Sequence, residues 1–176
     1  GNYSGQGSWT NMVATQAISG SRVHKENDLW LTGSIKINPL KGWNIHADYT
    51  YNMYIRHKKY HGKEIVEHYA NPEVTTIFPH ITPSSVKFTS DDDYYQVFNA
   101  YTDYEHNFGK HGIKLLAGYN YERKDYRWFD AERQNLISQD IASLGMAYGE
   151  KYNGSGEHAW ATMGYFARLN YNYDDR

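Results

Sequence analysis

The stretch that decides the fold is Trp43 to Ile55, with the sequence WNIHADYTYNMYI. Its apolar and aromatic residues alternate with mostly polar residues without a slip, so the pattern has a period of two residues. This period predicts a β-strand rather than a helix. The stretch is also long, because strands of globular proteins typically run to about 5–6 residues, whereas a tilted strand that crosses a bilayer needs roughly 9–11. This length is the first indication that its apolar side faces lipid.

Four further segments alternate in the same way, and they set the fold class. Residues 27–38, 94–105, 113–122 and 159–173 each predict a strand. Short Gly-containing turns at 39–42 and 109–112 alternate with long loops at about 56–92 and 127–158, and residues 1–26 predict a loop before the first strand. We therefore expect an all-β, antiparallel up-and-down arrangement of about five long strands over 27–176. The short turns then lie at one end and the long loops at the other, as in outer-membrane barrels.

Charge separates the two sides of these strands. One side carries apolar and aromatic residues without Asp, Glu, Lys or Arg, and the other carries charged residues such as Asp48, Asp103 and Arg168. In the decisive stretch, Trp43 and the pair Tyr49 and Tyr51 flank an aliphatic middle, as in the aromatic girdles of membrane barrels. A packed core would enforce the same charge separation, so a secreted β-sandwich that binds carbohydrate, or a surface adhesin, stays open as an alternative.

Composition excludes several classes of function. The net charge of −2 gives no basic footprint for nucleic acid, and the absence of cysteine excludes disulfide scaffolds and thiolate chemistry. Mean hydropathy is −0.82, and no stretch approaches the roughly 18 apolar residues of a transmembrane helix. No nucleophile elbow, phosphate loop or zinc-protease motif occurs. We expect no enzyme activity, no cofactor and no metal site.

Several short strings, taken in order, carry a resemblance to a known family. Asn27-Asp28-Leu29-Trp30-Leu31-Thr32-Gly33 opens the series and Pro39-Leu40-Lys41-Gly42-Trp43 follows it. Further strings are Phe98-Asn99-Ala100-Tyr101, Tyr104-Glu105, Phe108-Gly109-Lys110-His111, Leu116-Ala117-Gly118-Tyr119-Asn120 and Met163-Gly164-Tyr165-Phe166-Ala167-Arg168-Leu169-Asn170-Tyr171. Together they resemble the barrel of SusC/RagA-type TonB-dependent outer-membrane transporters of Bacteroidetes. The resemblance runs over nearly the whole chain.

The resemblance implies a location, a cargo and a set of partners. It implies a bacterial outer-membrane barrel of about 22 strands with a plugged lumen. The implied partners are outer-membrane lipid, the remainder of the barrel and its plug, TonB acting through that plug, and a SusD-like surface lipoprotein. The implied cargo is an oligomeric nutrient, usually an oligosaccharide and sometimes a peptide. The chain starts at Gly1 without a signal segment and stops at the end of a strand pattern, so we expect it to be an internal piece of a longer protein. Compared with the family, it lacks a plug, a TonB-binding box and a C-terminal closing strand.

The alternation also assigns residues to the two sides of the barrel wall. On the polar side, the residues expected to face the lumen are Asn44, His46, Asp48, Asn99, Tyr101, Asp103, Arg168 and Asn170. Trp128 and Phe129 fall at the start of the second long loop, where exposed aromatic rings can stack on cargo. Interface anchoring or loop packing explains these two aromatic residues equally well.

Overall fold

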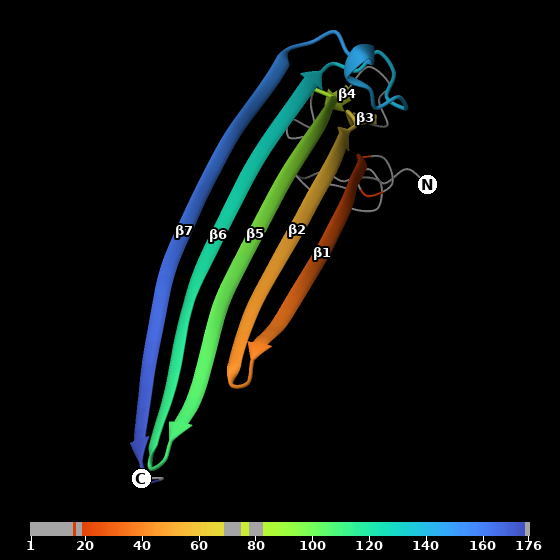
Figure 1. Ribbon diagram of the computed structural model, residues 1–176. Helices are drawn as coiled ribbons and strands as arrows, with labels where there is room; N and C mark the ends of the chain where they lie inside the picture. Colours follow the sequence, from red (N-terminus) through yellow and green to blue (C-terminus); the bar gives the residue numbers. More distant parts are fainter. Residues whose placement is uncertain (1–15, 17–18, 69–74, 78–82, 175–176) are drawn as a thin grey trace. The chain divides into compact units, whose positions relative to one another are not determined.

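The computed structural model describes residues 16, 19–68, 75–77 and 83–174, and these residues form a strand-rich structure. Five long strands dominate it: β1 (Gly20–Leu40), β2 (Trp43–Gly62), β5 (Ser85–Phe108), β6 (His111–Gln134) and β7 (Lys151–Tyr173). Each strand is hydrogen-bonded to its neighbour in the order β1-β2-β5-β6-β7, antiparallel throughout, with β1 and β7 at the two edges (Figure 1). The predicted all-β, up-and-down fold is confirmed.

The shorter elements lie in the connections. β3 (Val66–His68) pairs antiparallel with β4 (Thr75–Ile77), and a single 3-10 turn, η1 (Leu144–Met146), lies between β6 and β7. No helix in the described ranges has the length and apolar character needed to cross a membrane.

The long strands extend further than the hydropathy pattern predicted. The five strands contain 20 to 24 residues each, and they run well into the segments expected to be loop: β1 begins at Gly20, β2 ends at Gly62, β5 begins at Ser85, β6 ends at Gln134 and β7 begins at Lys151. The apolar alternation ends earlier because both sides of the strands carry charge there, with Arg123 and Asp125 on the side that is apolar further along β6 and cross-strand ion pairs on the polar side. Lys124 Nζ lies 2.9 Å from Asp93 Oδ2, and Arg56 Nε lies 2.8 Å from Asp91 Oδ2.

The residues group into two compact units. The turn unit comprises Asn27–Ile55, Asp92–Arg127 and Glu157–Arg176, and the loop unit comprises Gly1–Glu26, Arg56–Asp91 and Trp128–Gly156. Gly42 and Gly109 lie in the two tight turns of the turn unit with φ of +82° and +63°. Both values lie in the left-handed region that glycine adopts without steric cost, as the turn sequences predicted.

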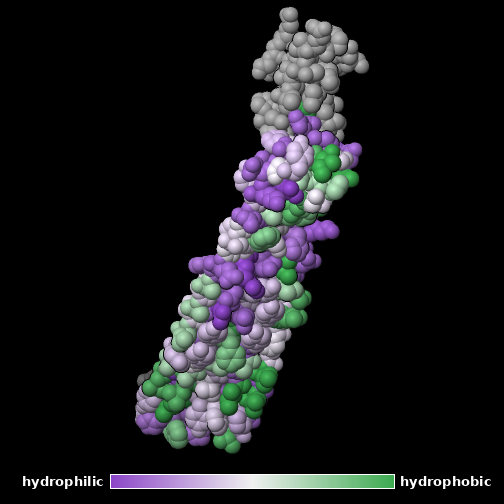
Figure 2. Space-filling view, turned by 90° about the horizontal axis from the view of Figure 1, so that it is seen from above, coloured by the Kyte–Doolittle hydropathy of each residue, from purple (hydrophilic) through white to green (hydrophobic). Residues whose placement is uncertain are grey.

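The turn unit has an apolar side that nothing in the described structure covers. Ile35, Leu169 and Tyr165 are 63%, 65% and 80% exposed. All three belong to the alternating apolar set, and Figure 2 shows hydrophobic side chains gathered at the surface toward the lower end of the view. Tyr49 of β2 and Leu115 of β6 are each 45% exposed on the same side, and a monomeric soluble domain rarely exposes a contiguous apolar patch. The side chains that a sandwich would bury are therefore at the surface here.

The loop unit has a small core of its own. Val86, Leu136 and Ala147 are buried together, with Phe88, Ala142 and Leu144 packed against them. The backbone N–H of Leu136 donates to Ser84 Oγ at 3.0 Å, which ties the β6–β7 connection to the start of β5. Lys63 Nζ donates to Asp140 Oδ1 at 2.7 Å, and this contact lowers the pKa of the Asp140 carboxyl below its usual value.

Candidate functional site

The polar side of the turn unit carries a connected cluster near the short turns. Asn44 Nδ2 donates to Asp103 Oδ2 at 2.6 Å, and His46 Nε2 lies 3.3 Å from Asp103 Oδ1. The His46 ring stacks on Tyr101 with 4.5 Å between centroids and 6° between planes, and the Asn38 amide contacts Asn44. Trp43, the neighbour of Asn44, contacts Thr102 instead, so the two residues point to opposite sides of β2. Four of the predicted polar-side residues therefore meet in one place.

The other predicted polar-side residues lie apart from this cluster. Asn99 Oδ1 accepts from Asn120 Nδ2 at 2.7 Å across β5 and β6, while Asp48 is half-buried on β2. Arg168 and Asn170 are exposed on β7, and Asn170 lines a shallow hollow of about 250 Å³. Whether these residues face a lumen stays a prediction.

An aromatic row that sequence reasoning missed crosses the same polar side. The Trp30 ring on β1 lies 6.4 Å from the Tyr95 ring on β5, edge to face, and Tyr95 lies 6.4 Å from the Trp160 ring on β7. We call these three residues the aromatic row. Its members come from three strands far apart in sequence. Predicting that they lie close together would have required the register of those strands.

Polar groups surround the aromatic row. The Tyr95 hydroxyl hydrogen-bonds with the Glu122 carboxylate, and Asn52, which is only 7% exposed, donates through Nδ2 to Asp28 Oδ1 at 2.6 Å and to the Leu29 carbonyl at 3.1 Å. The Lys124–Asp93 ion pair belongs to the same unit. The row is thus an aromatic surface within a polar wall rather than part of the apolar side.

Trp128 and Phe129 lie in β6 and not in a loop, which differs from the expectation. Trp128 covers two glycines of the next strand: a Cβ built on Gly156 would meet its Nε1 at 2.5 Å, and one built on Gly154 would meet the ring at 3.1 Å. Phe129 is the next residue of the strand, so it points to the other side, and it is 50% exposed. The two rings do not form one surface, and Trp128 packs against backbone.

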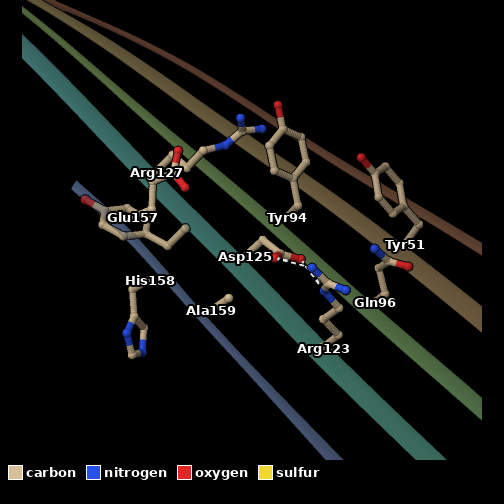
Figure 3. Close-up of a pocket in the computed structure, with 10 residues that line it drawn as sticks. Tyr51, Tyr94, Gln96, Arg123, Asp125, Arg127, Glu157, His158 and Ala159 are labelled. Atoms are coloured by element: carbon tan, nitrogen blue, oxygen red, sulfur yellow. Dashed lines mark hydrogen bonds and ion pairs between the residues drawn. The ribbon is translucent and has the colours of Figure 1, made fainter. Parts of the chain in front are cut away.

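A charged hollow of about 550 Å³ lies on the turn unit, where the apolar pattern of β6 ends (Figure 3). Arg123 donates from Nε and Nη2 to Asp125, both at 2.7 Å, and the Arg127 guanidinium lies 5.8 Å from the Tyr94 ring centre. Glu157 of β7 adds a second carboxylate. The hollow therefore holds two cations and two anions. These charged residues follow the last apolar residues on the same side of β6 and β7, so the apolar side ends here.

The loop unit carries a tight ion-pair cluster. Asp91, with a side chain only 8% exposed, lies 2.8 Å from Arg56 Nε and 3.5 Å from Lys58 Nζ. Lys87 Nζ lies 3.0 Å from Asp130 Oδ2 across β5 and β6. In the described part of the chain, no group of three or more His, Asp and Glu side chains is arranged to hold a metal ion.

Replacing Asp91 with Asn should destabilise the loop unit by about 1–2 kcal/mol, because Arg56 and Lys58 lose their shared anion. Both cations are about one third exposed, so water screens part of the loss. Faster amide hydrogen exchange at 56–62 and 85–91 would be the readout. Asp130→Asn, which removes a better-solvated partner, should have a smaller effect, and an effect of equal size would contradict the ranking.

Comparisons with known proteins support the fold alone. No protein-family profile matches the chain, and no curated protein matches it either. Solved structures do: the RagAB peptide importer in its closed-closed state has a TM-score of 0.75 at 16% identity, covering 89% of this chain and 17% of that chain. The RagAB peptide transporter and the open-open importer give TM-scores of 0.77 and 0.76 at 15% identity, each covering 92% of this chain and 17% of the other. The chain therefore spans 17% of the length of these solved chains.

Proposed function

We propose that this chain is part of the barrel wall of a TonB-dependent outer-membrane importer of oligomeric nutrients. The observation that carries the proposal is the exposed apolar side of the turn unit, where Ile35, Leu169 and Tyr165 lie at the surface. Lipid is the solvent for which such a side is suited, because an antiparallel wall alternates an apolar outer side with a polar inner side. The fold likeness to the RagAB importer chains supports the same assignment.

In this proposal, each part of the chain has a place in the importer. The tight turns at Gly42 and Gly109 lie on the periplasmic side, and the long connections between the strands lie on the extracellular side. The apolar side contacts outer-membrane lipid, and Asn44, His46 and Asp103 face a wet lumen or the plug. The rest of the barrel, the plug, TonB and a SusD-like lipoprotein belong to the parent assembly.

Oligosaccharide is the first candidate cargo, on the family resemblance. Peptide is the second, because the solved chains of similar fold belong to a peptide importer. Growth of cells carrying the full-length gene, compared with a deletion strain, on single oligosaccharides or on peptides as the sole carbon source separates the two.

Membrane residence tests the proposal directly. The full-length protein should fractionate with the outer membrane and should change its gel mobility on boiling, as folded barrels do. Its extraction should require detergent, because the apolar side has no protein cover in this segment. A protein that stays folded and monodisperse in plain buffer would contradict the proposal and favour the secreted β-sandwich. Membrane residence without any uptake defect in the deletion strain would favour an adhesin.

A further inference from the structure

The aromatic row is the feature that the proposed importer leaves without a role. Trp30 is 57% exposed and Trp160 is 38% exposed, although both lie on the polar side of the turn unit. An indole ring exposed to water does not gain the favourable free energy of burial unless a ligand or another side chain covers it.

The spacing of the row gives it the form of a binding surface. Tyr95 lies between the two indoles at 6.4 Å from each, tilted by 66° and 52°. The rings therefore do not stack face to face, and their faces are not covered by one another. Tyr95 contacts an indole ring on each side, so the three rings already form one surface in the unbound chain.

The surroundings indicate what chemistry the row accepts. Asp28, Asp93 and Glu122 place carboxylates around the rings, with Lys124 as the cation of the same group. This balance disfavours an anionic ligand. A neutral ligand with a flat C–H surface and a rim of hydroxyls fits better, because the rings take the apolar face while carboxylates accept from the hydroxyls and the Lys124 ammonium donates to them. A sugar ring has both properties.

We propose that Trp30, Tyr95 and Trp160 form a stacking site for neutral oligosaccharide on the inner wall of the barrel. The site rests on the proposed function and deepens it by naming where the cargo is held. A segment of the plug is the competing occupant, since a plug side chain could cover the same rings.

The experiment measures sugar binding by the purified full-length importer in detergent. Maltohexaose, cellohexaose, xylohexaose and mannohexaose are titrated separately by calorimetry, with a neutral Gly-Ser hexapeptide as the non-sugar probe. At least one sugar should bind, and Trp30→Ala and Trp160→Ala should each raise its Kd by about three- to tenfold, in line with the size of single aromatic contacts. Trp30→Phe should keep most of the affinity.

Tyr165→Ala is the matched control, because Tyr165 is an 80% exposed aromatic residue on the apolar side of β7. Its sugar Kd should not change. Unchanged affinity in the Trp30→Ala, Trp160→Ala double variant, absence of binding by every sugar, or tighter binding of the hexapeptide would overturn the site.

Thermal unfolding distinguishes the two candidate occupants of the aromatic row, a plug segment and a sugar. Loss of thermal stability in the tryptophan variants without any loss of sugar affinity would assign the row to the plug and overturn the site. A protein that inserts in the outer membrane but fails the binding test leaves the proposed function standing. Sugar binding by a protein that never enters the membrane would support the stacking site and contradict the proposed importer.

Discussion

Replacing Ala47 with Arg in the full-length protein should abolish its assembly in the outer membrane. Ala47 lies on the apolar side of β2 between Ile45 and Tyr49, in the middle of the expected lipid-facing band. An arginine facing lipid at the bilayer midplane costs roughly 2–4 kcal/mol. That is a large part of the margin of most folded proteins, 5–15 kcal/mol. Outer-membrane fractionation combined with gel mobility before and after boiling measures the folded fraction.

Asn44→Arg is the matched control for this substitution. It lies three residues away on the same strand but on the polar side, where its new guanidinium would meet Asp103. We expect near-normal assembly. A second pair, Ile35→Arg against Ser34→Arg on β1, repeats the comparison on another strand. Equal tolerance on both sides would show that the apolar side does not face lipid.

Replacing Gly42 with Val should destabilise the first hairpin by about 3 kcal/mol. Gly42 has φ of +82°, a conformation in which a β-branched residue is a strained outlier. A Cβ at this position would also lie 2.3 Å from the backbone carbonyl oxygen of Glu105, whose own N–H donates to the Gly42 carbonyl at 2.8 Å. Backbone atoms cannot turn away as a flexible side chain can. The midpoint of urea unfolding of the full-length protein in lipid vesicles is the measurement.

Gly33→Val serves as the control for the turn. Gly33 lies in β1 outside the positive-φ region, and a Cβ there meets nothing within 4 Å. Because valine favours strands, this variant should be neutral or slightly stabilising. An unfolding midpoint that falls as far for Gly33→Val as for Gly42→Val would mean that the loss comes from added bulk and not from the turn.

Much of the sheet was predictable because one physical signal governs it. Alternation over 43–55 defines which residues share a side of β2, and the contacts agree: Asn44 and His46 reach Asp103, whereas Trp43 reaches Thr102. Gly42 in the left-handed region was predictable from the turn sequence for the same local reason.

The loop ends of the strands were not predictable from hydropathy. Alternation reports a difference between the two sides of a strand, and it vanishes where both sides carry charge. Arg56 and Lys58 therefore looked like loop, although the ladder continues through them and pairs both with Asp91. Trp128 was placed in a loop for the same reason, although it lies over Gly154 and Gly156 of the neighbouring strand.

The aromatic row shows a different limit. Trp30, Tyr95 and Trp160 each have the right parity for the polar side, but parity does not say which residues share a level across the sheet. That depends on the register of β1, β5 and β7, which is determined by turn lengths and contacts spread over the whole sheet.

The open edges at β1 and β7 have a consequence for how mutations elsewhere in the gene affect this segment. In the described part of the chain, each edge presents unpaired backbone groups along its outer side. In hydrocarbon every such group costs several kcal/mol, so only a closed ring of strands is stable there. If the proposed importer is correct, the stability of these residues belongs to the whole ring. A nonsense mutation in the codons of a distant β-strand of the full-length protein would then remove this segment from the cell surface without changing one of its residues.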